Sequence, residues 1–222
     1  MKFLIFFLAF FANTQIFAKP YFAAESIAPS LLNPPPTINE NEINQIIKLQ
    51  KNFDLTEIDE ALAEKQLRPE TILLAVDEKF SRQSYPKLYH FLDRVSETSH
   101  QTTDKIKSHW NKTRPYLADS RVNMLISPSF GGSYPAGHTT GSYIYAHILS
   151  LLLPQKRQDF FSIAEKISQH RILVGMHYPS DASAGKQLAL LIIGAMTQKD
   201  EFQKDFMKAK EEIEISAAKI RN

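Results

Sequence analysis

The chain has 222 residues and carries 26 Lys and Arg against 24 Asp and Glu, which gives a formal net charge of +2. This near-balance supplies no field that would attract nucleic acid or an anionic membrane as the main partner. The sequence contains no cysteine, so thiol catalysis, disulfides and zinc sites with thiolate ligands are excluded.

Residues 1–18, MKFLIFFLAFFANTQIFA, have the pattern of a secretory signal peptide. A lysine precedes an apolar run that is shorter than the roughly 20 residues needed to cross a bilayer. We therefore expect cleavage after Ala18 and a periplasmic or secreted protein. Cleavage after Ala23 or Ala24 and an uncleaved membrane anchor are the alternatives.

Two further parts follow the signal peptide. Residues 19–36 end in NPPP and are expected to form a stiff, extended lead-in rather than core, and residues 37–222 to form one domain. Thr37 and Glu40 have the spacing of a capping box, so the first helix is expected to begin at Thr37. Apolar residues follow at helical period: Ile43, Ile46, Ile47 and Leu49.

Helical periodicity recurs through the rest of the chain, whereas alternating polar and β-branched residues are almost absent. The expected fold class is therefore an all-α, compact multi-helix domain. The apolar runs at 143–154 and 188–196 are too short to span a membrane and are expected to be central helices. Helices are expected at 56–66, 69–80, 86–112, 139–153, 157–175, 181–197 and 200–219. In the last of these, residues available to pack on the body are Phe202, Phe206, Met207 and Ile213.

The segment KSHWNKTRPY places Lys107 and Arg114 seven residues apart, near a helix end that Pro115 helps to define. Seven residues are two helical turns, so both cations are expected to project from one face and to grip one anion. Two solvated surface cations are the alternative.

The segment GGSYPAGHTTGS combines a glycine-rich turn with the start of a helix near residues 138–140. Gly131, Gly132 and Pro135 turn the backbone, and Gly137 lets an anion approach main-chain N–H groups. His138 at this point could donate a proton to a leaving group.

The segment HRILVGMHYPSDAS contains Arg171, His177 and Asp181. Gly175 is expected to end one helix, and Ser180 to cap the next. A carboxylate four residues after His177 can accept its Nδ1–H and leave Nε2 as a nucleophile.

The remaining histidines could bind a metal or could simply lie at the surface or in the packing. A metal site from His170, His177 and Asp181 is conceivable, but the spacing matches no HExxH-type motif, so no metal is expected. The histidines interpreted as surface or packing positions are His90, His100, His109 and His147.

Taken in order, Lys-x6-Arg-Pro, Pro-x-Gly-His and Arg-x5-His-x3-Asp resemble the signature of the type 2 phosphatidic acid phosphatase superfamily, which includes the vanadium haloperoxidases. The LNPPP lead-in, GSYP, AGHT and HYPSDASAG are similar to the bacterial class A nonspecific acid phosphatases, and the resemblance covers roughly residues 30–220. It implies the central helical core of that superfamily and an exported, metal-independent acid phosphatase without a cofactor.

The resemblance also implies roles for individual residues. His177 would be the nucleophile that forms a phosphohistidine, Asp181 would orient it, and His138 would serve as general acid and then as base. The residues that would bind phosphate are Lys107, Arg114, Arg171 and Gly137.

The implied substrates are a broad range of organic phosphomonoesters, with inorganic phosphate and vanadate as inhibitors and an acidic optimum. Neither nucleic acid nor a stable membrane span is expected. The sequence leaves open whether phosphate passes to water or to another alcohol, and whether the chain forms a homo-oligomer.

Two positions depart from the family pattern, which usually has serine where this chain has Ala136 and His170. The missing hydroxyl at 136 would cost about one to two powers of ten in rate unless Ser133, Thr139 or a water fills the gap. His170 would add charge to the pocket rim or pack. A lipid-phosphate or lipid A phosphatase, a haloperoxidase, and a degenerate phosphate-binding protein are the rival interpretations.

Overall fold

The computed structural model of the chain describes residues 18–221. The predicted signal peptide therefore lies outside the described residues, apart from Ala18. All regular elements of the described part are helices, which confirms the all-α fold class. The α-helices are α1 Glu40–Lys51, α2 Leu55–Ala63, α3 Pro69–Val76, α4 Pro86–Trp110, α5 Pro115–Ala118, α6 Gly137–Leu152, α7 Arg157–Leu173, α8 Pro179–Thr197 and α9 Asp200–Arg221.

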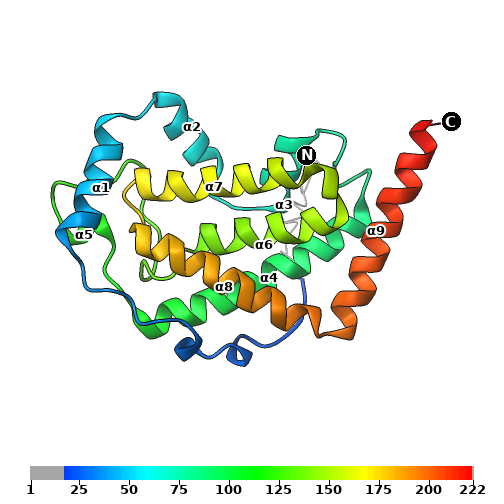
Figure 1. Cartoon of the computed structure of the whole chain (residues 1–222), viewed down its shortest axis with the longest axis horizontal. Helices are drawn as coiled ribbons and strands as arrows, with labels where there is room; N and C mark the ends of the chain where they lie inside the picture. Colours follow the sequence, from blue (N-terminus) through cyan, green and yellow to red (C-terminus); the bar gives the residue numbers. More distant parts are fainter. Residues whose placement is uncertain (1–17, 222) are drawn as a thin grey trace, which may run out of the picture.

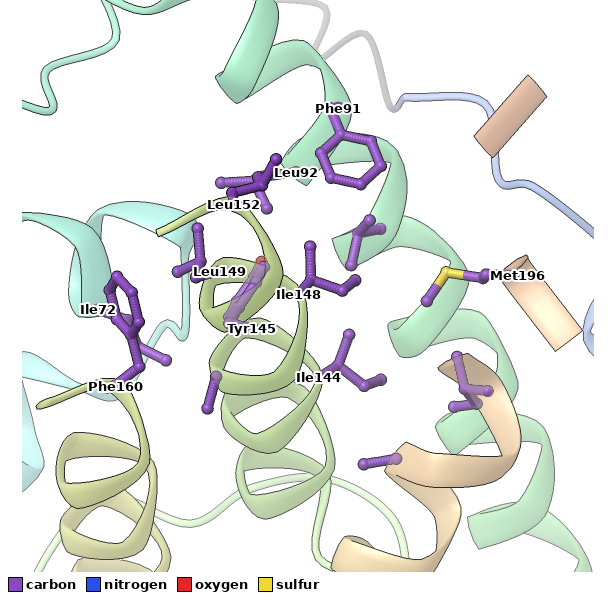
Figure 2. Close-up of a cluster of buried hydrophobic side chains, with 14 of the residues drawn as sticks. Ile72, Phe91, Leu92, Ile144, Tyr145, Ile148, Leu149, Leu152, Phe160 and Met196 are labelled. Carbon is purple, nitrogen blue, oxygen red and sulfur yellow. The ribbon is translucent and has the colours of Figure 1, made fainter. Parts of the chain in front are cut away.

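The core is built around α6, which contacts α4, α7 and α8 (Figure 1). Ile144, Ile148 and Leu149 are fully buried on α6, as predicted for the first apolar run (Figure 2). The second run lies on α8. Leu188 and Ile192 are buried there, but Leu190 is exposed, so one side of this helix faces solvent. In the described part, no helix is both long and apolar enough to cross a membrane.

The lead-in differs from the expectation, because its apolar side chains belong to the main core. Tyr21, Phe22, Ile27 and Leu32 are all buried there. Only two short 3-10 turns, Ala24–Ser26 and Pro29–Leu31, interrupt the segment. An extended chain buries side chains without helical period, which is why periodicity does not reveal it.

The last helix described, α9, packs across α4 (Figure 1). Phe202 is buried against Phe91 and Tyr21, with ring centroids 5.1 and 5.3 Å away. Ile213 is also buried, but Met207 is exposed, so its predicted packing role is wrong.

A buried charge cluster joins the lead-in, α4 and α9. The Arg94 guanidinium donates to Asp205 at 2.7 Å and to the Lys19 carbonyl at 2.9 Å, and it also pairs with Glu201. The Tyr21 hydroxyl donates to Asp205, and the Tyr21 ring lies 4.2 Å from the guanidinium carbon. Each charge in this cluster has an opposite charge beside it.

The first helix begins later than predicted. Asn39 is the N-cap of α1, and its side chain accepts a hydrogen bond from the Glu42 amide. Asparagine is a better N-cap than threonine, so Asn39 takes the role that the spacing assigns to Thr37.

Candidate active site

A pocket of about 500 Å³ lies between α4, the first half of α6 and the segment 64–68 that joins α2 to α3. Five of the seven predicted site residues line it. These are Lys107, Arg114, Gly137, His138 and His177. Arg171 and Asp181 do not line the pocket but adjoin residues that do.

Lys107 and Arg114 meet at the pocket for a different reason from the predicted one. Helix α4 ends at Trp110, and Asn111 turns the chain with a left-handed φ of 41°. Arg114 then lies in extended backbone ahead of α5, so the two cations do not share a helix face.

Both cations are buried against backbone carbonyls. Lys107 Nζ donates to the Gly132 carbonyl at 3.0 Å, and the Arg114 guanidinium donates to the carbonyls of Gly131, Phe130 and Met176. Neither forms a salt bridge with any described carboxylate. Burial, aided by the charge of Arg114, lowers the pKa of Lys107 to about 7.

The glycine turn places the start of α6 at the pocket. Gly131 has a φ of 74°, and a Cβ on Gly132 would lie 3.0 Å from the Asn111 Cα, so both positions favour glycine. Helix α6 begins at Gly137, slightly before the predicted start, with Ala136 as N-cap. The N–H groups of its first turn have no intrahelical acceptor and carry the positive end of the helix dipole.

His177 is fixed by a backbone carbonyl. The chain leaves α7 through Gly175, whose φ of 78° and contact with Asn123 exclude a side chain. His177 Nδ1 lies 2.7 Å from the Ser133 carbonyl, which can only accept, so Nδ1 carries the proton and Nε2 is the unprotonated nitrogen. Arg114 Nη1 is 3.4 Å from that Nε2. Burial lowers the pKa of His177 to about 3.

The Asp181 carboxylate contacts more than one partner. Its carboxylate accepts from the Tyr178 amide at 3.0 Å, which makes Tyr178 rather than Ser180 the N-cap of α8. Lys112 Nζ lies 2.8 Å from its other oxygen, and both groups are buried. His177 Nδ1 is 3.6 Å from the carboxylate, so Asp181 acts on it mainly by charge. Sequence reasoning missed Lys112, although it stands two residues before Arg114.

His138 is held by the segment 64–68. Its Nε2 lies 3.0 Å from the Glu64 carbonyl and 3.2 Å from the Lys65 carbonyl, so Nε2–H is the donor and Nδ1 is left for proton transfer. Burial, together with the charge of Arg171, lowers the pKa of His138 to about 4.

Glu64 is the second residue that sequence reasoning missed. Both its carboxylate oxygens lie 3.0 Å from His170 Nδ1, and one lies 3.4 Å from Arg171 Nη2. His170 is therefore paired and buried behind the site instead of charging the pocket rim. A lone glutamate just after the end of a short helix carries no signal that could have identified this role.

Of the other histidines, His100 is exposed, as the surface interpretation predicts, and it also lines the pocket. The two hydroxyls considered as replacements for the missing serine are engaged elsewhere. Ser133 Oγ lies 3.4 Å from the Thr113 carbonyl, and Thr139 Oγ1 lies 2.8 Å from Ser168 Oγ. Neither lines the pocket.

The sequence and the fold of the chain are similar to those of known phosphatases and of a haloperoxidase. Residues 95–204 match the PAP2 superfamily. A non-specific acid phosphatase of Providencia stuartii is 25% identical over 205 residues, covering 86% of this chain and 81% of that protein. An acid phosphatase of Zymomonas mobilis subsp. mobilis is 29% identical over 133 residues, covering 58% of this chain but only 50% of that protein. A bacterial vanadium-dependent iodoperoxidase shares the fold, with a TM-score of 0.55 at 14% identity over 73% of this chain and 52% of that one.

Proposed function

We propose that the chain is a phosphomonoesterase that needs no metal and works through a phosphohistidine, a proposal that the match of residues 95–204 to the PAP2 superfamily supports. One observation carries the proposal. In the described part of the chain, one pocket is surrounded by two buried cations that have no carboxylate partner, two neutral histidines and a helix N-terminus. Fixed positive charges of this kind can stabilise the equatorial oxygens of a transferring phosphoryl group.

In the first step, His177 Nε2 attacks phosphorus. The N–P bond forms while the P–O bond to the leaving group breaks, and the leaving oxygen takes a proton from His138. The Ser133 carbonyl holds the proton on Nδ1, and the charge of Asp181 stabilises the ring as it becomes cationic. In the second step, His138 removes a proton from water, water oxygen bonds to phosphorus, and Nε2 is released.

The protonation states couple catalysis to binding. His138 has a pKa of about 4 in the empty pocket, so it is neutral at most pH values. A bound phosphate dianion adds negative charge and raises that pKa, which lets His138 arrive at the transition state protonated. His138 therefore takes up its proton when substrate binds, and activity is expected to decline toward alkaline pH.

The pocket also supports a broad substrate range. Its volume of about 500 Å³ far exceeds that of a phosphate group, and apolar and polar side chains share its wall beyond the cations. These include Leu67, Val95, Ser99 and Ile144.

Hydrolysis of p-nitrophenyl phosphate between pH 4 and 8 in excess EDTA tests the proposal. We expect turnover that survives EDTA, is greater below neutrality and disappears in His177→Ala, because no other group replaces Nε2. Trapping of acid-labile, base-stable phosphate on the wild type would identify the intermediate. Full activity in His177→Ala would rule the mechanism out.

A degenerate phosphate-binding protein is the second candidate, favoured by Ala136 in place of serine. Such a protein would bind phosphate or vanadate without releasing product, and only Ala136→Ser would gain activity. A lipid-phosphate phosphatase would instead turn over phosphatidic acid in detergent micelles much faster than p-nitrophenyl phosphate. The same assay, run with both substrates, separates these outcomes.

A further inference from the structure

The absence of a serine at position 136 leaves the proposed phosphate site one hydroxyl short of the family pattern. A hydrogen bond to a charged group is strong enough that its loss would be felt in the rate. The two nearby hydroxyls on the same turn and helix are already committed to other partners, Ser133 to the Thr113 carbonyl and Thr139 to Ser168. Any direct protein replacement must therefore come from another element of the pocket wall.

Thr103 on α4 meets this requirement. It lines the pocket, lies one helical turn before Lys107 and is only 3% exposed. Its hydroxyl is buried and has no hydrogen-bond partner among the described residues. A buried hydroxyl without a partner costs free energy, so its retention calls for a ligand or a solvent molecule that completes it.

The position of Thr103 relative to the start of α6 is defined by Gly137. A Cβ built on Gly137 would lie 3.5 Å from Lys107 Cε and 3.6 Å from the Thr103 methyl. Both side chains therefore flank the first turn of α6, where the free N–H groups lie. Threonine in a helix populates two χ1 rotamers, and a rotation about χ1 can bring the hydroxyl to the place that the methyl now holds. Because the hydroxyl has no partner among the described residues, that rotation breaks no hydrogen bond in the described part.

We infer that the Thr103 hydroxyl binds the substrate's phosphate and supplies the hydrogen bond that the family's serine would have made. The inference rests on the proposed function, since it assigns one more residue to the same phosphate site. It makes Thr103 a phosphate-binding residue beside Lys107 and the α6 N-terminus. A sulfate or vanadate ion in the site would be held by the same hydroxyl.

Thr103→Val tests the inference, because it removes the hydroxyl and keeps the shape. We expect kcat/KM for p-nitrophenyl phosphate to fall about ten- to a hundredfold, the factor that matches a hydrogen bond to a charged group. Thr103→Ser should keep most of the activity. Thr102→Val is the matched control, since the neighbouring Thr102 is equally buried but its hydroxyl donates to the Thr98 carbonyl.

A double mutant shows whether Thr103 does the work of the missing serine at position 136 or has only a structural role. If Thr103 replaces the missing serine, Ala136→Ser should rescue Thr103→Val by a larger factor than it improves the wild type. Equal factors in both backgrounds, an unchanged kcat/KM in Thr103→Val, or an equal loss in Thr102→Val would overturn the inference.

Sulfate binding by calorimetry separates this inference from the proposed function. If the wild type binds sulfate but hydrolyses nothing, the proposed enzyme is wrong, while weaker sulfate binding in Thr103→Val would still support the role of Thr103. If the wild type hydrolyses phosphomonoesters and Thr103→Val does so equally well with unchanged sulfate affinity, the enzyme stands and this inference fails.

Discussion

Helix α4 carries a buried cation toward each end, and the two are compensated in opposite ways. Arg94 and Lys107 are thirteen residues apart, or about 20 Å along the helix. Arg94 is met by the carboxylates of Asp205 and Glu201. Lys107 has the Gly132 carbonyl as its hydrogen-bond partner, and its neighbour Arg114 likewise bonds carbonyls.

The contrast separates a charge that holds the fold together from a charge held ready for a ligand. Burying an ion without a counterion is costly, and proteins tolerate it mainly where function requires it. At the Arg94 end the counterion is part of the chain. At the Lys107 end the described residues supply carbonyls instead of a carboxylate, and a phosphate dianion would bring the opposite charge.

Removal of the paired cation should have the largest effect. Arg94→Ala leaves Asp205 buried without its partner, so we expect the free energy of unfolding to fall by about 3–5 kcal/mol. Urea unfolding measures this, and the activity of the folded fraction should be unchanged. Arg82→Ala is the control, since its pairs with Glu70 and Asp93 are exposed and should contribute less than about 1 kcal/mol. Equal losses in the two variants would contradict the distinction.

Removal of the unpaired cation should act in the opposite direction. Lys107→Met replaces a poorly compensated buried charge, so we expect about 1–4 kcal/mol of added stability together with a large loss of phosphatase activity. Because the folded pKa of Lys107 is lowered to about 7, the cost of its charge is fully present below pH 7. That cost fades as the pH rises toward the ordinary lysine value. Thermal melts at pH 6 and 9 should show a larger gain at pH 6, and a loss of stability at pH 6 would contradict the prediction.

The smallest expected effect is a change in sulfate affinity with pH, which can be measured on the wild type without altering a buried residue. Sulfate keeps its charge from pH 6 to 9, so a change in its affinity reports on the protein. A bound dianion favours protonated Lys107, and therefore affinity should fall by up to tenfold for each pH unit above 7, about 1.4 kcal/mol. Calorimetric titration of the wild type and Lys107→Met measures this. The variant should bind weakly with a shallower pH dependence, and a flat wild-type profile would contradict the assignment.

The long helices are predictable from sequence because each buries one stripe of apolar residues. The range 86–112 predicted for one helix compares with Pro86–Trp110 for α4. The lead-in is not predictable in this way, because Tyr21 and Phe22 reach the core from extended backbone. Exact helix starts depend on which of two nearby polar residues accepts a hydrogen bond from the first turn, as at Asn39.

The site is predictable as a set of residues but not as a set of contacts. The fold places His138, His177 and Lys107, one from each of the three motifs, at one pocket, as expected. The acceptor for His177 is a backbone carbonyl 44 residues away, and a carbonyl has no residue identity for a motif to reveal. Arg114 reaches the pocket beside Lys107, but not from the same helix face as predicted, because left-handed Asn111 ends the helix before it.

The contact between the Tyr21 hydroxyl and Asp205 joins residues 184 positions apart. Closing so long a loop has an entropic cost that must be met before the contact contributes, and such contacts generally form slowly. During synthesis, α9 also emerges after the helices around the pocket. We therefore expect the helices around the pocket to associate first, and the seam between lead-in, α4 and α9 to close last.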